Sequence, residues 1–564
     1  MKKMKKTICL IIMAVMVLSM ALCAQAAEPN AVPSEGDSNP VAVYNVEEGV
    51  TVTAYQIVDA TYGTHGLTGY IVADGVSLSD IERPTAAEIT AITRNINNKV
   101  LTTLESETLS WDSTTAAYTA DLGAGTWLIL VSNCNATVYN PMIVSNWYEN
   151  ANEAQTLTSG YVDADGNYEE LSASGGAVII YAKKDTTIID KEITNYHTGD
   201  GLTDFSEGAD YNVGDSVSFH ISTYIPDYSD SYANGKTVFT ITDTMSDGLA
   251  EVSADAVTVY VGDTVYSPTT TTTSGSVSRT VTNYTLTVSG QVITIAFEPW
   301  FIIEHGAESV DVYYTTILEE DAFFADESNP NSVLLEYSNH PDTTYFAEDI
   351  VYVYTFRLTD EIAKVTPDGT ASSNGSDVTV TNPLAGAEFT IYTDADCTQV
   401  YSNSLTDGVM TTGEDGYVTF EGLAEGTYYI RETESPDNYM LNDTIYMVVI
   451  SAVYDTVSGS ATEGMLLEYT ITSTDLTTGT EYSNTYEIDY ETTEIDKTDE
   501  RDAYILVSGY TLNVSQNPVA IVDPDLVRLP STGGAGVYVI IGISMAILGA
   551  CGVFVIRKRK ISER

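Results

Sequence analysis

Lysine is the scarce reactive side chain of this sequence. The 564 residues contain 23 Lys and Arg against 80 Asp and Glu. Between residues 27 and 532 only seven lysines remain: Lys99, Lys183, Lys184, Lys191, Lys236, Lys364 and Lys497. A lysine amine becomes a nucleophile when burial in an apolar core disfavours its charged form. The position of each lysine is therefore informative.

Other chemistry-bearing patterns are missing from the sequence. The five histidines pair with no Cys or Glu at zinc-ligand spacing, and no glycine-rich phosphate loop or nucleophile elbow occurs. Exposed carboxylates could bind calcium, but no D-x-D-x-D-G loop marks a site. The sequence therefore predicts no conventional enzyme, no cofactor and no metal site.

The composition restricts the partners and the fold class. The formal net charge is -57, and 43% of the residues are hydrophobic. Such acidity repels phosphate and so excludes nucleic-acid binding, while the apolar content is too high for a disordered acidic chain. Tyr (39) outnumbers Phe (12), and Thr and Val are frequent, which is typical of half-buried strands.

Most of the chain alternates apolar and polar residues with a period of two, as in Val257–Val261 and Val292–Phe297. Short strands separated by Gly- and Asp-rich turns predict tandem β-sandwiches of the immunoglobulin type. Apolar residues at helical spacing between 84 and 100 predict one amphipathic helix that packs on a sheet. Three blocks are expected, at 27–182, 185–347 and 350–525. Cys134 and Cys397 fall in different blocks, so we expect no disulfide.

Both ends of the chain have the composition of targeting segments. Residues 1–26 combine a basic start, an apolar run and Ala24-Gln25-Ala26, which predicts a secretory signal peptide. The apolar run 535–556 is long enough to span a bilayer as a transmembrane helix, and the basic segment 557–564 would stay in the cytoplasm. Just before the run lie five residues of an LPxTG motif: Leu529, Pro530, Ser531, Thr532 and Gly533. In this order the three parts resemble the cell-wall sorting signal of Gram-positive surface proteins, in which a sortase cleaves between Thr and Gly and transfers the Thr carbonyl to an amine.

Motifs in the second and third blocks resemble the backbone pilins of sortase-assembled Gram-positive pili. The third block is similar to collagen-adhesin B-type domains, including their E-box, in the segments Pro383–Tyr392, Gly416–Leu423 and Tyr428–Pro436. The second block resembles the middle domain of backbone pilins in the segments Ile188–Lys191, Ile241–Asp243 and Tyr337–Pro341. The resemblance implies a major pilin subunit with an N-terminal pilin domain, a middle domain and a collagen-adhesin B-type domain.

The resemblance also implies autocatalytic isopeptide bonds between lysine and asparagine, each assisted by a buried acid. In the second block we assign Lys191 as the nucleophile, Asn339 as the acceptor and Asp243 as the acid. In the third block we assign Lys364 and the acid Glu432.

The acceptor of the third block is less firmly fixed. Asn517 is favoured over Asn484 and Asn513, because its separation of 153 positions from Lys364 is close to the 148 between Lys191 and Asn339. In the first block Lys99 lies outside any such motif, so no bond is expected there, and the role of Lys497 stays open.

The last assignment implied by the resemblance is the lysine that joins subunits. Val178–Lys183 is similar to the pilin motif, although Ala182 replaces its proline and Lys184 follows directly. We expect Lys183, with Lys184 as the alternative, to accept the Thr532 carbonyl of an identical subunit.

The expected partners are therefore a pilus-specific and a housekeeping sortase, identical subunits and peptidoglycan, at the cell surface. The alternative is a monomeric wall-anchored adhesin, or a basal or tip pilin, whose ligand the sequence does not identify.

Overall fold

The computed structural model describes residues 32–148, 157–162, 168–171, 177–194, 205–233, 235–274, 277–359, 361–373, 378–495, 504–525 and 559–561. The expected signal peptide, sorting motif and membrane-spanning run lie outside these residues, as do Lys497 and most of the basic tail. Within the described ranges, no helix combines the length and apolar character that a bilayer crossing requires.

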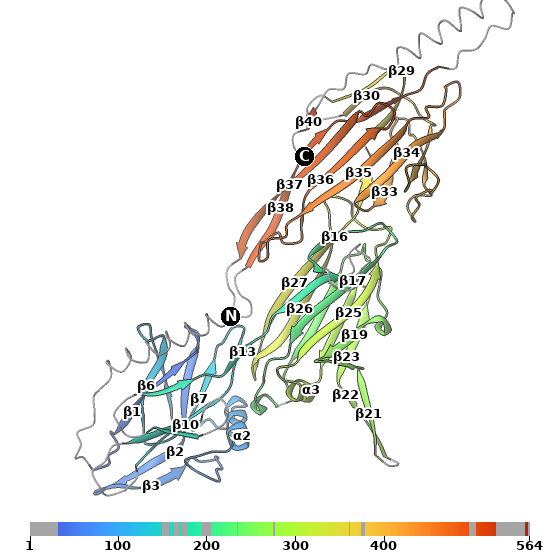
Figure 1. The fold of residues 1–564 in the computed structure, drawn as a ribbon. Helices are drawn as coiled ribbons and strands as arrows, with labels where there is room; N and C mark the ends of the chain where they lie inside the picture. The colour runs from blue at the N-terminus through green and yellow to red at the C-terminus, as the bar shows by residue number, and fades with distance from the viewer. Residues whose placement is uncertain are drawn as a thin grey trace, which may run out of the picture.

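Three β-rich units follow one another in chain order, from the blue end of the chain to the red end in Figure 1. Each unit has its own buried apolar core, and strands far outnumber helices. The expected mostly β fold of tandem sandwiches is therefore confirmed.

The first unit contains two main sheets and a two-stranded one. Their orders are β12-β1-β6-β5, then β11-β10-β9-β7-β2-β3 with β4 beside β2, and β13-β8. The strands are β1 (Ser38–Tyr44), β2 (Thr51–Gly63), β3 (Gly66–Val72), β4 (Ser106–Thr108), β5 (Ser110–Asp112), β6 (Ala117–Gly123), β7 (Gly125–Ser132), β8 (Thr137–Tyr139), β9 (Met142–Trp147), β10 (Thr158–Val162), β11 (Tyr168–Leu171), β12 (Val178–Tyr181) and β13 (Lys184–Thr186).

The expected helix is α2 (Ala86–Asn97), which lies in this unit. Thr85 caps it: its side chain accepts from the Glu88 backbone N–H, while the Glu88 side chain accepts from the Thr85 N–H. Ile92 is buried against the sheet residues of the unit. The helix therefore packs on the sheet, as its periodicity predicts.

The second unit is a sandwich of two six-stranded sheets, β15-β14-β17-β25-β19-β20 and β16-β27-β26-β18-β24-β23, with a separate hairpin β21-β22 that extends away from the body (Figure 1). Its elements are β14 (Ile189–Thr194), β15 (Phe205–Ser206), β16 (Gly208–Asp210), β17 (Ser216–Tyr224), η1 (Asp230–Tyr232), β18 (Phe239–Met245), η2 (Ala254–Ala256), β19 (Thr258–Val261), β20 (Thr264–Tyr266), β21 (Thr269–Ser274), β22 (Val277–Thr282), β23 (Tyr284–Ser289), β24 (Val292–Phe297), α3 (Pro299–Glu304), β25 (Ser309–Ile317), β26 (Asn329–His340) and β27 (Thr343–Tyr354).

The third unit pairs the sheet β32-β31-β34-β35-β36-β37-β38-β40 with the smaller sheets β30-β29-β39 and β28-β33. Its strands are β28 (Phe356–Leu358), β29 (Ile362–Ser373), β30 (Val378–Pro383), β31 (Glu388–Tyr392), β32 (Val409–Thr411), β33 (Phe420–Leu423), β34 (Gly426–Glu434), β35 (Ile445–Tyr454), β36 (Leu466–Asp475), β37 (Glu481–Ile495), β38 (Tyr504–Gln516), β39 (Val519–Val522) and β40 (Arg559–Ile561).

Hydrogen bonds join the second unit to the third. Asp210 Oδ2 accepts from Tyr454 Oη at 2.9 Å, and Asn212 Oδ1 accepts from Tyr401 Oη at 3.0 Å and from the Ala424 N–H at 2.9 Å. Asp210 is fully buried. Because buried polar groups are costly to leave unpaired, these bonds favour one fixed arrangement at this junction.

Candidate functional site

Two lysines of the described chain are fully buried, Lys191 and Lys364. Each occupies an inward-facing position of a strand, where an apolar side chain is normally found. On β14 the buried positions alternate as Ile189, Lys191 and Ile193. On β29, Lys364 lies in the buried run Ile362–Val365. An unpaired buried charge is expensive, so each lysine must be neutral or have partners within reach.

In the second unit, Lys191 meets an acid from the opposite sheet. Asp243 lies on β18, whose buried positions include Phe239, Ile241 and Met245, so its carboxyl also points into the core. Lys191 Nζ donates a hydrogen bond to Asp243 Oδ2. The assigned nucleophile and acid are thus brought together across the sandwich.

Burial changes the proton affinity of both groups in the direction that the chemistry requires. Desolvation lowers the pKa of the Lys191 amine and raises the pKa of the Asp243 carboxyl. Aromatic rings complete the surroundings, with the centroid of Phe219 5.1 Å from Nζ. A neutral amine beside a neutral carboxylic acid is the arrangement needed for attack on an amide carbonyl.

The residue that completes this site is Asn331, and the assignment of Asn339 as acceptor is wrong on geometry. Asn331 is fully buried on β26, and its amide nitrogen donates to Tyr314 Oη at 2.6 Å, while Lys191 Nζ donates to the same hydroxyl at 3.1 Å. The Asn331 Oδ1 atom is buried and has no hydrogen-bond partner. Asn331 therefore presents an amide carbonyl whose oxygen is free to be polarised.

Asn339 instead belongs to the junction with the first unit. Val333 pairs with Asp243 across the sheet, and Asn339 lies six positions further along β26, about 20 Å at the usual rise of a strand. Its Nδ2 donates to the backbone carbonyls of Cys134 and Asn135, both at 2.7 Å. Asn339 therefore stabilises a contact between units and does not reach Lys191.

The third unit builds an analogous site. Lys364 Nζ donates to Glu432 Oε2 at 2.8 Å and also to Asp523 Oδ1. Glu432 comes from β34 in the large sheet, whereas Asp523 directly follows β39, the strand that runs parallel to β29. Desolvation raises the pKa of the Glu432 carboxyl to about 7. The predicted pair of Lys364 and Glu432 is thus in contact.

The second group in contact with Lys364 is a carboxyl and not an asparagine. Asp523 is fully buried, its Oδ2 has no hydrogen-bond partner, and it occupies the place beside Lys364 that was assigned to Asn517. The Asn517 backbone N–H donates to Asn484 Oδ1 at 2.7 Å, and the Asn513 side chain donates to Asp489 on the surface. Neither the expected acceptor Asn517 nor its alternatives Asn484 and Asn513 are hydrogen-bonded to Lys364, whose amine contacts Glu432 and Asp523.

Asn331 and Asp523, the residues that lie beside the two lysines, continue the inward phase of their strands, but this phase is shared by other residues. On β26, Asn331 alternates in phase with the apolar Val333 and Leu335. After β39, Asp523 continues the inward alternation of Val519 and Ile521. On β26, Asn329 and Asn339 are also buried at this phase, so only the pairing of Asn331 with Met245, two positions from Asp243, distinguishes it.

The two candidate assembly lysines lie side by side but differ in exposure. The Lys183 side chain is 46% exposed and forms an ion pair with Asp227 at 2.7 Å, whereas the Lys184 side chain is 30% exposed and lies 3.7 Å from Glu47. Ion pairs at a surface are weak and exchange readily with water. Lys183 is thus the more accessible amine. Lys99 is also exposed, and the described part of the first unit contains no buried lysine.

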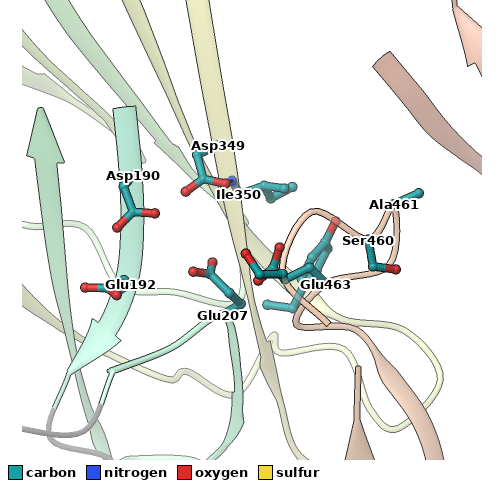
Figure 2. Close-up of a pocket in the computed structure, with 10 residues that line it drawn as sticks. Asp190, Glu192, Glu207, Asp349, Ile350, Ser460, Ala461 and Glu463 are labelled. Atoms are coloured by element: carbon teal, nitrogen blue, oxygen red, sulfur yellow. Dashed lines mark hydrogen bonds between the residues drawn. The ribbon is translucent and has the colours of Figure 1, made fainter. Parts of the chain in front are cut away.

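A second polar feature is the acidic pocket in Figure 2, where the second unit faces the loop 458–463 of the third. The cavity has a volume of about 380 Å³. Carboxylate oxygens of Asp190, Glu207 and Asp349 lie within 4.8 Å of one another. Desolvation, together with repulsion from neighbouring carboxylates, raises the pKa of Glu207 to about 9 and that of Asp349 to about 6.

Comparisons with known proteins agree with this architecture. A family described as the T6 antigen Ig-like domain matches residues 36–171, and the SpaA family, a prealbumin-like fold domain, matches residues 370–464. The chain is 28% identical to the trypsin-resistant surface T6 protein of Streptococcus pyogenes serotype M6, over 93% of this chain and 96% of that protein.

One solved structure supports the same fold. The T6 backbone pilin of serotype M6 Streptococcus pyogenes matches with a TM-score of 0.57 and 21% identity, over 88% of this chain and 100% of that one. The full-length major pilin SpaD from Corynebacterium diphtheriae matches with a TM-score of 0.43 and 16% identity, over 74% of this chain and 91% of that one. The chain is therefore similar to the T6 surface protein along nearly its whole length, and its fold is similar to that of the T6 backbone pilin.

Proposed function

We propose that this chain is the shaft subunit of a covalent cell-surface pilus, with one internal isopeptide bond in its second unit and another in its third. Two relatives that cover most of the chain are a surface T6 protein and a T6 backbone pilin. The observation that carries the internal bonds is the presence of two buried sets of lysine, acid and acceptor in the two units.

The bond in the second unit would join Lys191 to Asn331. The neutral Lys191 amine attacks the Asn331 carbonyl carbon, and protonated Asp243 stabilises the developing oxyanion. The new amide forms as the bond from carbon to Nδ2 breaks. The nitrogen leaves as ammonia, so the reaction needs no oxidant and no cofactor.

The bond in the third unit would join Lys364 to Asp523. Here the amine attacks a carboxylic acid, Glu432 transfers protons, and the leaving group is water. This differs from the asparagine chemistry expected from the sequence, because the acceptor is an acid. The two units would therefore lose different small molecules.

Subunits would be joined through Lys183. A pilus-specific sortase would break the peptide bond between Thr532 and Gly533, and the Thr532 carbonyl would form an amide with Lys183 of an identical subunit. A housekeeping sortase would finally attach the fibre to peptidoglycan. The exposure of Lys183 supports this choice over Lys184, because an enzyme has to reach the amine.

The first test is the intact mass of the mature chain, residues 27–532, with tandem mass spectrometry of its peptides. We expect a deficit of one ammonia plus one water, with peptides cross-linked through Lys191–Asn331 and Lys364–Asp523. Variants Lys191→Met and Lys364→Met should each restore one of the two losses. An unmodified mass would contradict both internal bonds.

A monomeric wall-anchored adhesin or a minor pilin remains the alternative to a shaft subunit. A shaft subunit needs an acceptor lysine on its surface, whereas a monomeric adhesin does not. In the bacterium, Lys183→Ala should abolish the ladder of covalent polymers on a denaturing gel while the matched variant Lys184→Ala preserves it. A ladder that survives both substitutions would place the acceptor elsewhere, and a wild-type strain with no ladder would favour the adhesin.

A further inference from the structure

Tyr314 lies among all the reacting groups of the second unit. It comes from β25, where it pairs with Phe219, so its ring faces the same core as Lys191. Its hydroxyl accepts from Lys191 Nζ at 3.1 Å and from Asn331 Nδ2 at 2.6 Å. The same hydroxyl donates to the Asp243 carboxyl, with both oxygens at 3.0 Å. One phenol thus contacts the attacking nitrogen, the leaving nitrogen and the acid.

We propose that Tyr314 is a catalytic proton relay for the bond between Lys191 and Asn331, a role that rests on the isopeptide bond proposed above. The attacking nitrogen must lose one proton after it has bonded to the Asn331 carbon. The departing nitrogen must gain one, because an amide anion is too basic to leave. Tyr314 is hydrogen-bonded to both nitrogens, which no other described residue is.

The proton balance of the relay closes without another reactant. When Lys191 Nζ attacks, Asn331 Nδ2 ceases to be a planar amide nitrogen and gains a lone pair that can accept the phenol proton. Tyr314 gives its proton to Nδ2 and takes one from Nζ, so the hydroxyl is restored. The carbon–Nδ2 bond breaks and ammonia departs, while Asp243 stabilises the carbonyl oxygen.

The surroundings keep the phenol in its protonated form before the reaction. Burial and the neighbouring Asp243 carboxyl raise the pKa of Tyr314 well above its usual value. Tyr314 can therefore act as an acid towards Nδ2 without first needing a proton from solvent.

The third unit offers an internal comparison. Its acceptor, Asp523, is a carboxyl whose leaving group is water, and Glu432 contacts Lys364 directly. Within the described residues, no tyrosine hydroxyl is hydrogen-bonded to Lys364, Glu432 or Asp523, and the Phe389 ring centroid lies 5.6 Å from the lysine nitrogen. The phenol thus accompanies the acceptor whose leaving group is harder to expel.

The test is the rate of ammonia loss in the mature chain carrying Tyr314→Phe. Freshly made protein is refolded from denaturant, and its intact mass is then measured over time. Phe keeps the ring and its packing but removes the hydroxyl. We expect the third unit to lose water normally and the ammonia loss to slow at least about tenfold. The matched control is Tyr284→Phe, because Tyr284 is also buried in the second unit but its hydroxyl donates to Tyr266 O at 2.7 Å.

A second variant separates a relay from a structural role. Asn331→Asp gives the second unit an acid acceptor, so its leaving group becomes water. Asp243, which is hydrogen-bonded to Lys191 Nζ, can then carry the proton from that nitrogen to the leaving oxygen, as Glu432 is proposed to do in the third unit, and no proton has to reach a leaving nitrogen. If Tyr314 is a relay, adding Tyr314→Phe to Asn331→Asp should leave the rate of water loss within about threefold of the Asn331→Asp parent. A structural role predicts that both Phe-containing proteins are slow.

The outcomes are distinguishable from failure of the proposed function. A Tyr314→Phe protein that loses ammonia at the wild-type rate overturns the relay, as does a double variant as slow as the single one. If wild-type protein never loses ammonia, the isopeptide bond of the second unit itself is refuted.

Discussion

Cleavage of the folded chain at chosen turns tests the positions of both internal bonds in one experiment. Bonds at Lys191–Asn331 and Lys364–Asp523 would close two covalent rings, spanning residues 191–331 and 364–523. Asp263, Asp342 and Thr478 are exposed turn positions, in the first ring, between the rings and in the second ring respectively. A protease site inserted at each turn gives three proteins that differ only in where they are cut.

The magnitude of the effect follows from the ring sizes. Closing rings of this length would remove on the order of 5 kcal/mol of chain entropy per ring from the unfolded state. A cut inside a ring leaves the two pieces covalently joined, although it should lower the stability of that unit. A cut between the rings at Asp342 severs the chain completely. The turn of the β26–β27 hairpin lies outside the first ring because Asn331, where that ring would close, is near the open end of the hairpin, opposite Val351.

The assay is a denaturing gel with intact mass after complete proteolysis. Proteins cut at Asp263 or Thr478 should each run as one species with the mass of the whole chain plus one water. The protein cut at Asp342 should separate into two fragments. The matched controls carry Lys191→Met with the Asp263 site and Lys364→Met with the Thr478 site, and both should fall into two pieces. Separation without these substitutions would refute the corresponding ring.

Three other measurements follow from the same geometry. Asp523→Asn should change the mass loss in the third unit from water to ammonia and leave the crosslink at the same position. Asp523→Ala should abolish the mass loss and lower the melting temperature. A crosslink to Asn517 in either variant would contradict Asp523 as the acceptor. Because burial raises the pKa values of Glu207 and Asp349 above their unfolded values, their protonated forms favour the folded state. The contribution of these two groups to stability should therefore be complete below about pH 4 and be lost as pH rises towards 9. Thermal melts should show that Glu207→Gln stabilises the protein at pH 8 but not at pH 4.5, and an equal effect at both would remove Glu207 as the cause.

Much of the fold follows from residue patterns alone. The period-two alternation predicts the sandwich strands, and apolar spacing between 84 and 100 predicts a helix, which the structure places at Ala86–Asn97. Both buried lysines and both acids were also predictable from the motifs around Lys191, Asp243, Lys364 and Glu432. These features are local, since each depends on residues within one strand or one turn.

The acceptors were not predictable by the same means, for a physical reason. Each acceptor must meet its lysine across long sequence separations, and the exact residue depends on how strands are paired in register. Asn331 and Asn339 lie eight positions apart on β26, and motif resemblance does not tell which of the two faces Lys191. Asn517 was chosen because the expected bond needed an asparagine, whereas the inward position beside β29 carries a carboxyl at Asp523. Asn331 and Asn339 share the inward phase of β26, so only the pairing of the strands distinguishes them.

The distribution of buried lysines agrees with the path that tension would take through the proposed fibre. If Thr532 of one subunit is joined to Lys183 of the next, tension enters each subunit after the first unit and leaves at its C-terminal end. The second and third units carry that load, and each contains a buried lysine with its acid and acceptor. The first unit lies outside the path between Lys183 and Thr532, so a covalent bond there would bear no tension. Its only lysine before Lys183 is the exposed Lys99.

The shortest covalent path through a subunit then consists of residues 183–191, 331–364 and 523–532. At about 3.4 Å per residue, this path limits the extension of a subunit to roughly 180 Å. Most of the chain between Lys183 and Thr532 is thereby removed from the load, and the β26–β27 hairpin is the longest segment left to bear it.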